Sequence, residues 1–177
     1  KLNEVEISSS EFGSVRGVQA LVKDAVVTAI AKINQAEYSW PFNASEFTQQ
    51  MIVAQEEYGW PSLYKVTDWN SFQLLKDDNL GVGFSKLNFI TLDEYFERYR
   101  NLDDDTGTTG RGVPSFVFPS GNGWGVTPSP DKAYQIKFRY YQVPATLSVS
   151  TDTSRIPTQY ENVIIDGAMF QMYLFKD

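Results

Sequence analysis

Clustered carboxylates are the side chains in this sequence best suited to chemistry. Asp103, Asp104 and Asp105 stand together in a polar, glycine-containing stretch at residues 101–112. Oxygen ligands beside glycines suit a calcium ion, but the alternating Asp-x-Asp-x-Asp-Gly spacing and the closing Glu of a calcium loop are missing. We therefore interpret the stretch as a solvated surface loop and expect no metal site.

Paired carboxylates could also act as the acid and the base of a glycosidase. Asp93 is followed by Glu94, and Asp77 is followed by Asp78. A glycosidase holds its two carboxyl groups about 5 to 10 Å apart across a cleft, whereas adjacent residues of a helix or strand point apart. We therefore interpret these carboxylates as part of a charged exterior. A carboxylate-based hydrolase is the least favoured of the function classes considered below.

Two missing residue types narrow the chemistry further. The 177-residue chain contains no cysteine and no histidine. Within this chain, that excludes disulfides, thiolate and imidazole metal sites, cysteine nucleophiles and the Ser-His-Asp arrangement. We predict a protein that is not an enzyme, with no catalytic residue and no cofactor.

Glycine and tryptophan give two further candidates for a binding site. The glycine-rich run 121–125 lacks the Lys-Ser/Thr pair of a phosphate loop and precedes no predicted helix, so we expect a hairpin turn there. Trp40, Trp60, Trp69 and Trp124 could stack on sugars, as in a β-rich carbohydrate- or receptor-binding module. Such large rings more often anchor a core or an interface.

The charge of the chain bears on nucleic acids and membranes. The formal net charge is −7, from 22 acidic and 15 basic residues. Tight DNA binding needs a basic surface that displaces counterions from phosphates, whereas an acidic surface lets a duplex slide past. No apolar run approaches the roughly 20 residues that span a bilayer, and no signal-peptide pattern is visible, so we expect no membrane partner.

A long helix is predicted near the start of the chain, from about Ser10 or Ser14 to Glu37. Residues 8–11 have the form of a capping box, which offers an earlier start. Apolar residues recur there at spacings of three and four, the period of one helix face: Val15, Val18, Val22, Ala25, Ala29, Ile33 and Ala36.

A second helix is predicted at the other end, after Pro157, with a capping box at 158–161. Its apolar positions are Tyr160, Val163, Ile164, Gly167, Ala168, Met172 and Phe175. The chain begins with Lys1 rather than Met and stops at Asp177 within this pattern, so we expect further residues at both ends.

Between the two helices the sequence favours strands. β-favouring runs predict strands at 47–53, 69–75, 116–118, 124–127 and 133–143, with turns at 59–61 and 120–123. The last strand alternates, which places Tyr134, Ile136, Phe138 and Tyr140 on one buried face. A capping box at 91–94 opens a short helix near 91–101.

These elements predict an α+β fold in which N- and C-terminal helices pack as a helical bundle with an inserted antiparallel β-rich region. The predicted domains are a helical one at 1–43 and 157–177 and a β-rich one at 44–156. Small residues on the end helices allow close approach. We expect packing or assembly through Val18, Val22, Ala25, Ala29, Ile33, Ile164, Gly167 and Ala168.

An ordered set of short motifs carries a resemblance to a known family. The motifs are Trp-Pro-Phe-Asn at 40–43, Pro-x-Pro-Asp-Lys-Ala-Tyr at 128–134, Arg-Tyr-Tyr at 139–141, an Asp and an Ile-Pro within 152–157, Ile-Ile-Asp-Gly-Ala at 164–168 and Tyr-Leu-Phe-Lys-Asp at 173–177. Together they resemble the podovirus head-to-tail adaptors, the tail tubular or connector-ring proteins, from the first helix through the last. No binding residue is carried over onto residues 56–87.

The resemblance implies a structural virion protein with defined partners. It implies a homo-oligomeric ring, dodecameric in that family, that joins the portal protein to the tail nozzle protein. Double-stranded DNA would leave the head through this ring without sequence-specific binding. The implied location is the head–tail interface of the virion, after synthesis in the host cytoplasm. The alternative is a β-rich carbohydrate- or receptor-binding virion module.

Overall fold

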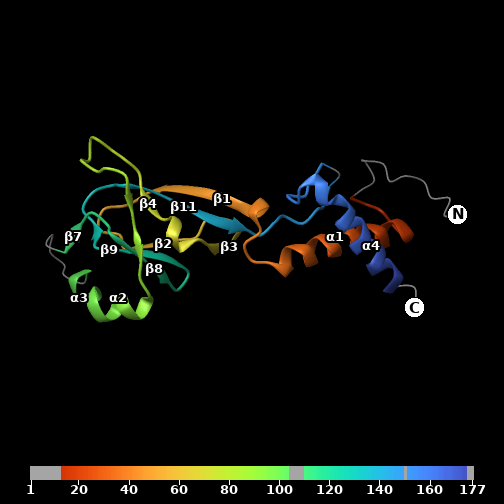
Figure 1. The fold of residues 1–177 in the computed structure, drawn as a ribbon, viewed down its shortest axis with the longest axis horizontal. Coiled ribbons are helices and arrows are strands. Elements are labelled where there is room, and N and C mark those ends of the chain that lie inside the picture. Colours follow the sequence, from red (N-terminus) through yellow and green to blue (C-terminus); the bar gives the residue numbers. More distant parts are fainter. Residues whose placement is uncertain (1–12, 104–109, 150, 175–177) are drawn as a thin grey trace. The chain divides into compact units, whose positions relative to one another are not determined.

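The fold is α+β, as predicted, and its elements fall into two compact units (Figure 1). The computed structural model describes residues 13–103, 110–149 and 151–174. The helical unit comprises Lys1–Asn43 and Val143–Asp177, and the β unit comprises Ala44–Gln142. Residues 143–156, which the sequence analysis grouped with the β-rich region, belong to the helical unit because strand pairing ends at Gln142.

The first helix, α1, spans Val18–Ala36 and starts later than the predicted Ser14. The reason is local: Gly17 precedes the helix with φ of 61°, a left-handed conformation that a helix cannot continue through. Ser10 and the predicted capping box at 8–11 lie outside the described residues. After α1 the chain makes one 3-10 turn, η1, at Pro41–Asn43.

The last helix, α4, spans Glu161–Leu174 and follows a 3-10 turn, η3, at Thr158–Tyr160. The predicted capping box at 158–161 is not the start of the helix. The chain enters through η3 instead, and Pro157, which precedes that turn, makes no side-chain capping hydrogen bond.

The β unit holds two larger sheets and one short pair. The first sheet is centred on β11 (Gln135–Gln142), which pairs antiparallel with β1 (Ala44–Gln50), β3 (Tyr64–Thr67) and β4 (Gln73–Leu74), while β5 (Ser85–Lys86) extends β4. The second sheet has the order β2 (Glu57–Gly59), β9 (Gly123–Thr127), β8 (Phe116–Ser120) and β6 (Asn88–Phe89). The short pair is β7 (Arg111–Gly112) with β10 (Ser129–Pro130).

The region is not wholly antiparallel, which corrects the prediction. β6 pairs with β8 in parallel, and so does β7 with β10. Parallel pairs require a crossover connection. For β6 and β8 that connection carries two helices, α2 at Leu92–Arg98 and α3 at Arg100–Asp103, so the short helix predicted near 91–101 is broken at Tyr99.

Two other local predictions differ in outcome. The capping residue of α2 is confirmed, because the Thr91 hydroxyl accepts a hydrogen bond from the Glu94 amide at 3.2 Å. The strand predicted at 69–75 is wrong over its first half. There Asp68 accepts a hydrogen bond from the Asn70 amide at 3.1 Å and holds a 3-10 turn instead, a local bond that competes with sheet pairing.

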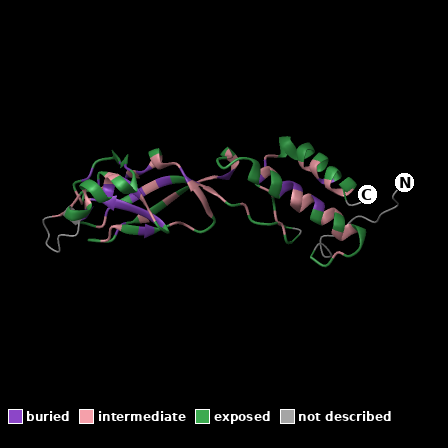
Figure 2. Cartoon of the chain, turned by 90° about the horizontal axis from the view of Figure 1, so that it is seen from below, coloured by how far each residue is buried: buried purple, intermediate pink, exposed green. Residues whose placement is uncertain are grey.

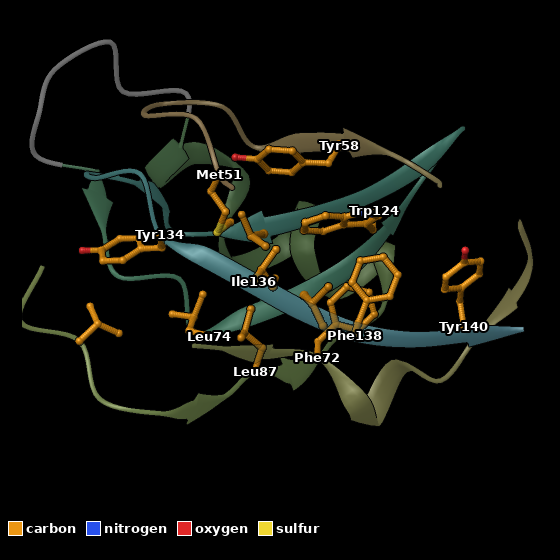
Figure 3. Packing of buried hydrophobic residues seen from close by; sticks show 13 residues of the cluster. Met51, Tyr58, Phe72, Leu74, Leu87, Trp124, Tyr134, Ile136, Phe138 and Tyr140 are labelled. Carbon is orange, nitrogen blue, oxygen red and sulfur yellow. The ribbon is translucent and has the colours of Figure 1, made fainter. Parts of the chain in front are cut away.

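Aromatic rings from both larger sheets meet in the core of the β unit (Figure 3). The predicted alternation is confirmed: Tyr134, directly before β11, and Ile136, Phe138 and Tyr140 on it are all buried. Phe138 stacks on Phe72 with ring centroids 4.3 Å apart, and it meets Trp124 of β9 edge-on at 5.5 Å. Trp124 in turn stacks on Tyr58. These contacts bind the two sheets into one unit.

The predicted hairpin is confirmed, since β8 and β9 are joined by residues 121 and 122. Gly123 begins the return strand directly against β2. A Cβ atom on Gly123 would lie 1.8 Å from the carbonyl oxygen of Tyr58, so only glycine fits there. A Cβ atom on Gly125 would lie 2.3 Å from the ring of Phe118. Both glycines let the backbone approach a neighbour closely.

Gly123→Ala is therefore expected to destabilise the β unit by about 3 kcal/mol, because the added methyl group overpacks a backbone contact. The free energy of unfolding is measured in urea by tryptophan fluorescence. Gly121→Ala is the matched control, since nothing lies within 4 Å of a Cβ atom there, and it should stay within about 0.5 kcal/mol of the parent. Equal stability of the two variants would contradict the tight contact.

The buried phenol of Tyr134 is expected to lower the free energy of unfolding at alkaline pH. Burial, and then the hydrogen bond to Asp131, raise the pKa of its phenol from 10.0 to about 12. Because the folded-state pKa is raised, this stabilisation is complete below about pH 10 and is lost as the pH rises through about 12. Urea unfolding across that window should show a steeper decline for the parent than for Tyr134→Phe. Tyr173→Phe is the control, and parallel declines of parent and Tyr134→Phe would refute the assignment.

Candidate assembly surface on the helical unit

The helices α1 and α4 lie side by side and meet through small residues (Figure 1). Ala25, Ala29 and Ala168 form a buried cluster, with Val26 and Met172 packed beside it. A Cβ atom on Gly167 would lie only 3.1 Å from the Cβ atom of Ala29. The short side chains thus allow the two backbones to approach closely, as the sequence analysis expected.

The eight residues predicted for packing or assembly do not all lie together. Four of them meet between the helices: Ala25, Ala29, Gly167 and Ala168. Val22 and Ile164 are half-buried, Ile33 lines a cavity, and Val18 is exposed. Whether any of them contacts another chain stays a prediction.

The sequence analysis missed a second surface, the outer side of α4. α1 carries buried positions, whereas α4 is exposed over most of its length (Figure 2). Large apolar side chains on that helix are about half exposed or more: Val163 52%, Ile165 50%, Met169 49%, Phe170 58%, Tyr173 66% and Leu174 59%. Contiguous exposed apolar surface of this kind marks an interaction site.

The signal for this surface was present in the sequence. A helix that is apolar on all sides needs neighbours on all sides. The apolar face predicted for this helix includes Ile164, Gly167 and Ala168. It does not include Met169 and Phe170, which lie between Ala168 and the next predicted apolar position.

A cavity of about 510 Å³ opens beside the first turn of α4, within the helical unit. Its wall is almost entirely apolar and is formed by Ile33, Trp40, Pro41, Phe42, Ile156, Pro157, Gln159, Tyr160 and Val163. Two contacts hold Trp40 in this wall. The Trp40 indole N–H donates a hydrogen bond to the Ile33 carbonyl at 2.8 Å, and its ring stacks on Phe42 with centroids 5.2 Å apart.

The tryptophans of the β unit serve its core. Trp124 is fully buried, and Trp60 and Trp69 pack against the same cluster. Trp60 stacks on Tyr64 with ring centroids 4.0 Å apart, and Trp69 stacks on Phe72. Ring faces used in this way anchor the fold, which is the structural interpretation that the sequence analysis preferred.

Three of the carboxylates that suggested a hydrolase have local partners. Asp77 accepts a hydrogen bond from the Asn79 amide at 2.9 Å, Asp78 pairs with Lys76 at 3.2 Å, and Glu94 pairs with Arg98 at 3.0 Å. Across the part of the chain that the structure describes, no group of three or more acidic residues is placed to hold a metal ion. Residues 104 and 105 of the suspected calcium loop lie outside that part.

None of the described helices is both long and apolar enough to cross a bilayer.

The contact between Gly167 and Ala29 predicts how much volume this site accepts. Gly167→Leu should lower the free energy of unfolding by about 3 kcal/mol, because the side chain has no room against α1. Gly167→Ala should change it by less than about 1 kcal/mol, since better helix propensity offsets the tight methyl contact. Urea unfolding followed by far-ultraviolet circular dichroism measures both. Ala31→Leu, at an exposed position of α1, is the control, and the close approach is refuted if Gly167→Leu matches it.

Comparison with known proteins adds the family. No curated protein matches the chain. A family model described as SU10 adaptor protein matches residues 9–177, nearly the whole sequence. The match covers both end helices and the β unit between them, as the resemblance noted in the sequence analysis did. The chain therefore belongs to the SU10 adaptor protein family of phage head-to-tail adaptors, which are structural proteins of the virion.

Proposed function

We propose that this protein forms a ring that joins the portal protein of a phage head to the tail nozzle protein. The single observation that carries the proposal is the exposed apolar side of α4, which the described part of the helical unit leaves uncovered. Burying apolar surface stabilises an assembly by roughly 25 cal/mol per Å². Covering this side of α4 in an oligomer removes it from water.

Closure into a ring sets a geometric condition on the helical unit. Each copy contacts two neighbours through two different surfaces, and the rotation between copies must close. The predicted helical bundle is compatible with this condition, because α1 and α4 form a pair among the residues that the structure describes, and neighbouring copies would add further helices. The family resemblance implies twelve copies. We assign the contacts between neighbouring copies to the helical unit.

The proposed channel carries double-stranded DNA without gripping it. The net charge of −7 opposes tight binding of phosphates, and a channel of this acidic protein would let the duplex pass. We further propose that the protein lies at the head–tail interface of the virion, after synthesis in the host cytoplasm, with no membrane partner. A carbohydrate-binding module has less support, because the tryptophan faces of the β unit pack into its core.

The test is assembly of the purified chain with the portal protein of the same phage. Parent protein should add the mass of a closed ring to portal particles, as read by native mass spectrometry. Met169→Glu with Phe170→Glu should lower that assembly at least tenfold, because two charges would be buried in the contact. Both positions are exposed in the single subunit, so the variant should keep its circular dichroism spectrum.

The matched control is Ala31→Glu, which places a charge at an exposed position of α1. It should assemble like the parent. A parent protein that stays folded, adds no mass to the portal and binds glycans instead would sink the proposal in favour of the binding module.

A further inference from the structure

We infer that the outer edge of β1 receives an extended segment of another virion protein, which adds to the first sheet of the β unit as a further strand. The inference goes beyond the proposed function, which assigns the contacts between copies to the helical unit. It takes from the family only the class of the partner. The surface consists of main-chain groups of β1 and of the turn that follows this strand.

β1 is a border strand of its sheet and is paired on one side only (Figure 1). It spans Ala44–Gln50 and pairs with β11 in unbroken register, and among the described strands only β11 is longer. Border strands are commonly protected from further pairing by short length, proline, a bulge or charged side chains. β1 contains no proline, lysine or bulge. Its one charged side chain, Glu46, is paired with Lys137 of β11 at 2.6 Å and so is held toward its own sheet.

The hydrogen bonds of β1 show which main-chain groups point away from the sheet. In an antiparallel pair, every second residue exchanges its N–H and C=O groups with the partner strand. Met51, directly after β1, donates its N–H to the Tyr134 carbonyl at 2.7 Å, so the odd-numbered residues face β11. The residues with outward main-chain groups are the three exposed ones: Glu46, Thr48 and Gln50. Within the part of the chain that the structure describes, these outward groups form no hydrogen bond.

Phe47 decides which side chains a further strand must carry. It packs at the rim of the core, edge-on to Phe138 with ring centroids 5.6 Å apart, and remains only half-buried. Opposite a new strand, Phe47 would occupy a non-hydrogen-bonded pair, in which side chains lie closest together. An apolar side chain there would extend the core, and the next side chain along the strand would face water beside Thr48. The partner segment therefore alternates apolar and polar residues.

The turn after β1 adds an apolar contact that is held in place. Gln55 donates its N–H to the Ile52 carbonyl at 3.1 Å. The buried Tyr58 hydroxyl accepts a hydrogen bond from the Ile52 N–H at 3.1 Å and donates one to the Gln55 carbonyl at 2.9 Å. The turn nevertheless exposes two large apolar side chains, Ile52 at 58% and Val53 at 46%. Both lie within about 10 Å of Gln50 along the chain, so a segment paired with β1 comes within their reach.

The length of β1 favours another protein over a second copy of this chain. Every other described strand with an unpaired side has four residues or fewer, too short to pair along the whole of β1. Two β1 strands could pair with each other, but that contact would be two-fold and would use the same patch on both copies. A ring needs two different patches. Head-to-tail adaptors assemble with other virion proteins, and these are the source that we assign to the segment.

The test uses short overlapping synthetic peptides that together cover the other structural proteins of the phage virion and this chain itself. Binding of each peptide to the purified full chain is measured by fluorescence polarisation. We expect binding by a peptide of another virion protein that alternates apolar and polar residues. Binding by no peptide, or only by peptides of this chain, would overturn the inference.

Methylation of the peptide backbone tests strand pairing without altering the protein. A strand pairs with one neighbour through the N–H groups of every second residue. N-methyl groups on that set should lower the affinity at least tenfold, because they remove the donors. N-methyl groups on the intervening residues, which face water, should leave the affinity within about twofold of the parent peptide. Equal affinity of the two methylated peptides would contradict pairing along an edge.

Hydrogen exchange on the unaltered protein identifies the edge. The bound peptide should slow exchange of the Glu46, Thr48 and Gln50 amides at least tenfold, because each gains a hydrogen bond. The amides of Phe47 and Gln49 are already paired with β11 and serve as internal controls, with unchanged rates. Unchanged rates at Glu46, Thr48 and Gln50 in the bound protein would rule out β1 as the site.

A proline variant removes one outward donor. Thr48→Pro should lower peptide affinity at least tenfold and leave the circular dichroism spectrum unchanged, because proline is tolerated where the N–H points away from the sheet. Thr48→Ala keeps the N–H and is the matched control, with the affinity of the parent. A folded Thr48→Pro variant that binds like Thr48→Ala would speak against the inference.

Serine variants test the turn separately. Ile52→Ser combined with Val53→Ser should weaken binding at least threefold, because apolar area is lost from the contact. Leu63→Ser is the control, since Leu63 is 54% exposed in the turn before β3 and should not affect binding. Equal affinity of the turn variant and this control would remove Ile52 and Val53 from the proposed surface.

These measurements are independent of ring formation. A chain that assembles on portal particles but binds none of the peptides would leave the proposed function standing and overturn this inference. A chain that binds a peptide along β1 but adds no mass to the portal would support the edge as a docking site and count against the ring.

Discussion

The close approach of α1 and α4 is the constraint on which the helical unit depends. Gly167 and Ala29 leave no room for larger side chains between the two backbones, so the apolar bulk of α4 must point elsewhere. The large side chains consequently gather on its outer side, where Phe170 and Leu174 are more than half exposed. The same distribution of small and large residues along α4 thus gives both the close contact with α1 and the exposed apolar side.

The cavity follows from how the chain enters and leaves these helices. The short link between α1 and η1 turns Trp40 back onto the end of α1, and the segment through Pro157 brings Ile156 to the start of α4. Neither segment belongs to α1 or α4, and together they form a cavity that the two helices alone would lack. Packed cores deform little, so a cavity held by a hydrogen bond and a stacked ring keeps its shape.

The β unit solves a different problem, which is how to stabilise many short strands. Several of them contain only two residues, and isolated pairs of that length are not stable in water. The aromatic cluster around Phe138 and Trp124 supplies the stabilisation instead, since each large ring buries a large apolar area. Glycines at 123 and 125 admit the backbones and rings that this packing requires.

The sequence by itself determined the features that depend on residues close together in the chain. The α+β class, the Thr91 cap, the hairpin at 121–122 and the buried face of β11 all follow from local bonding and from side-chain alternation. Tertiary structure decided which apolar surfaces are buried against another element. Periodicity identifies an apolar face of α4, but only the position of α1 shows that the other apolar side is left exposed. The cavity joins residues more than a hundred positions apart, from Ile33 to Val163, and no local pattern encodes that distance.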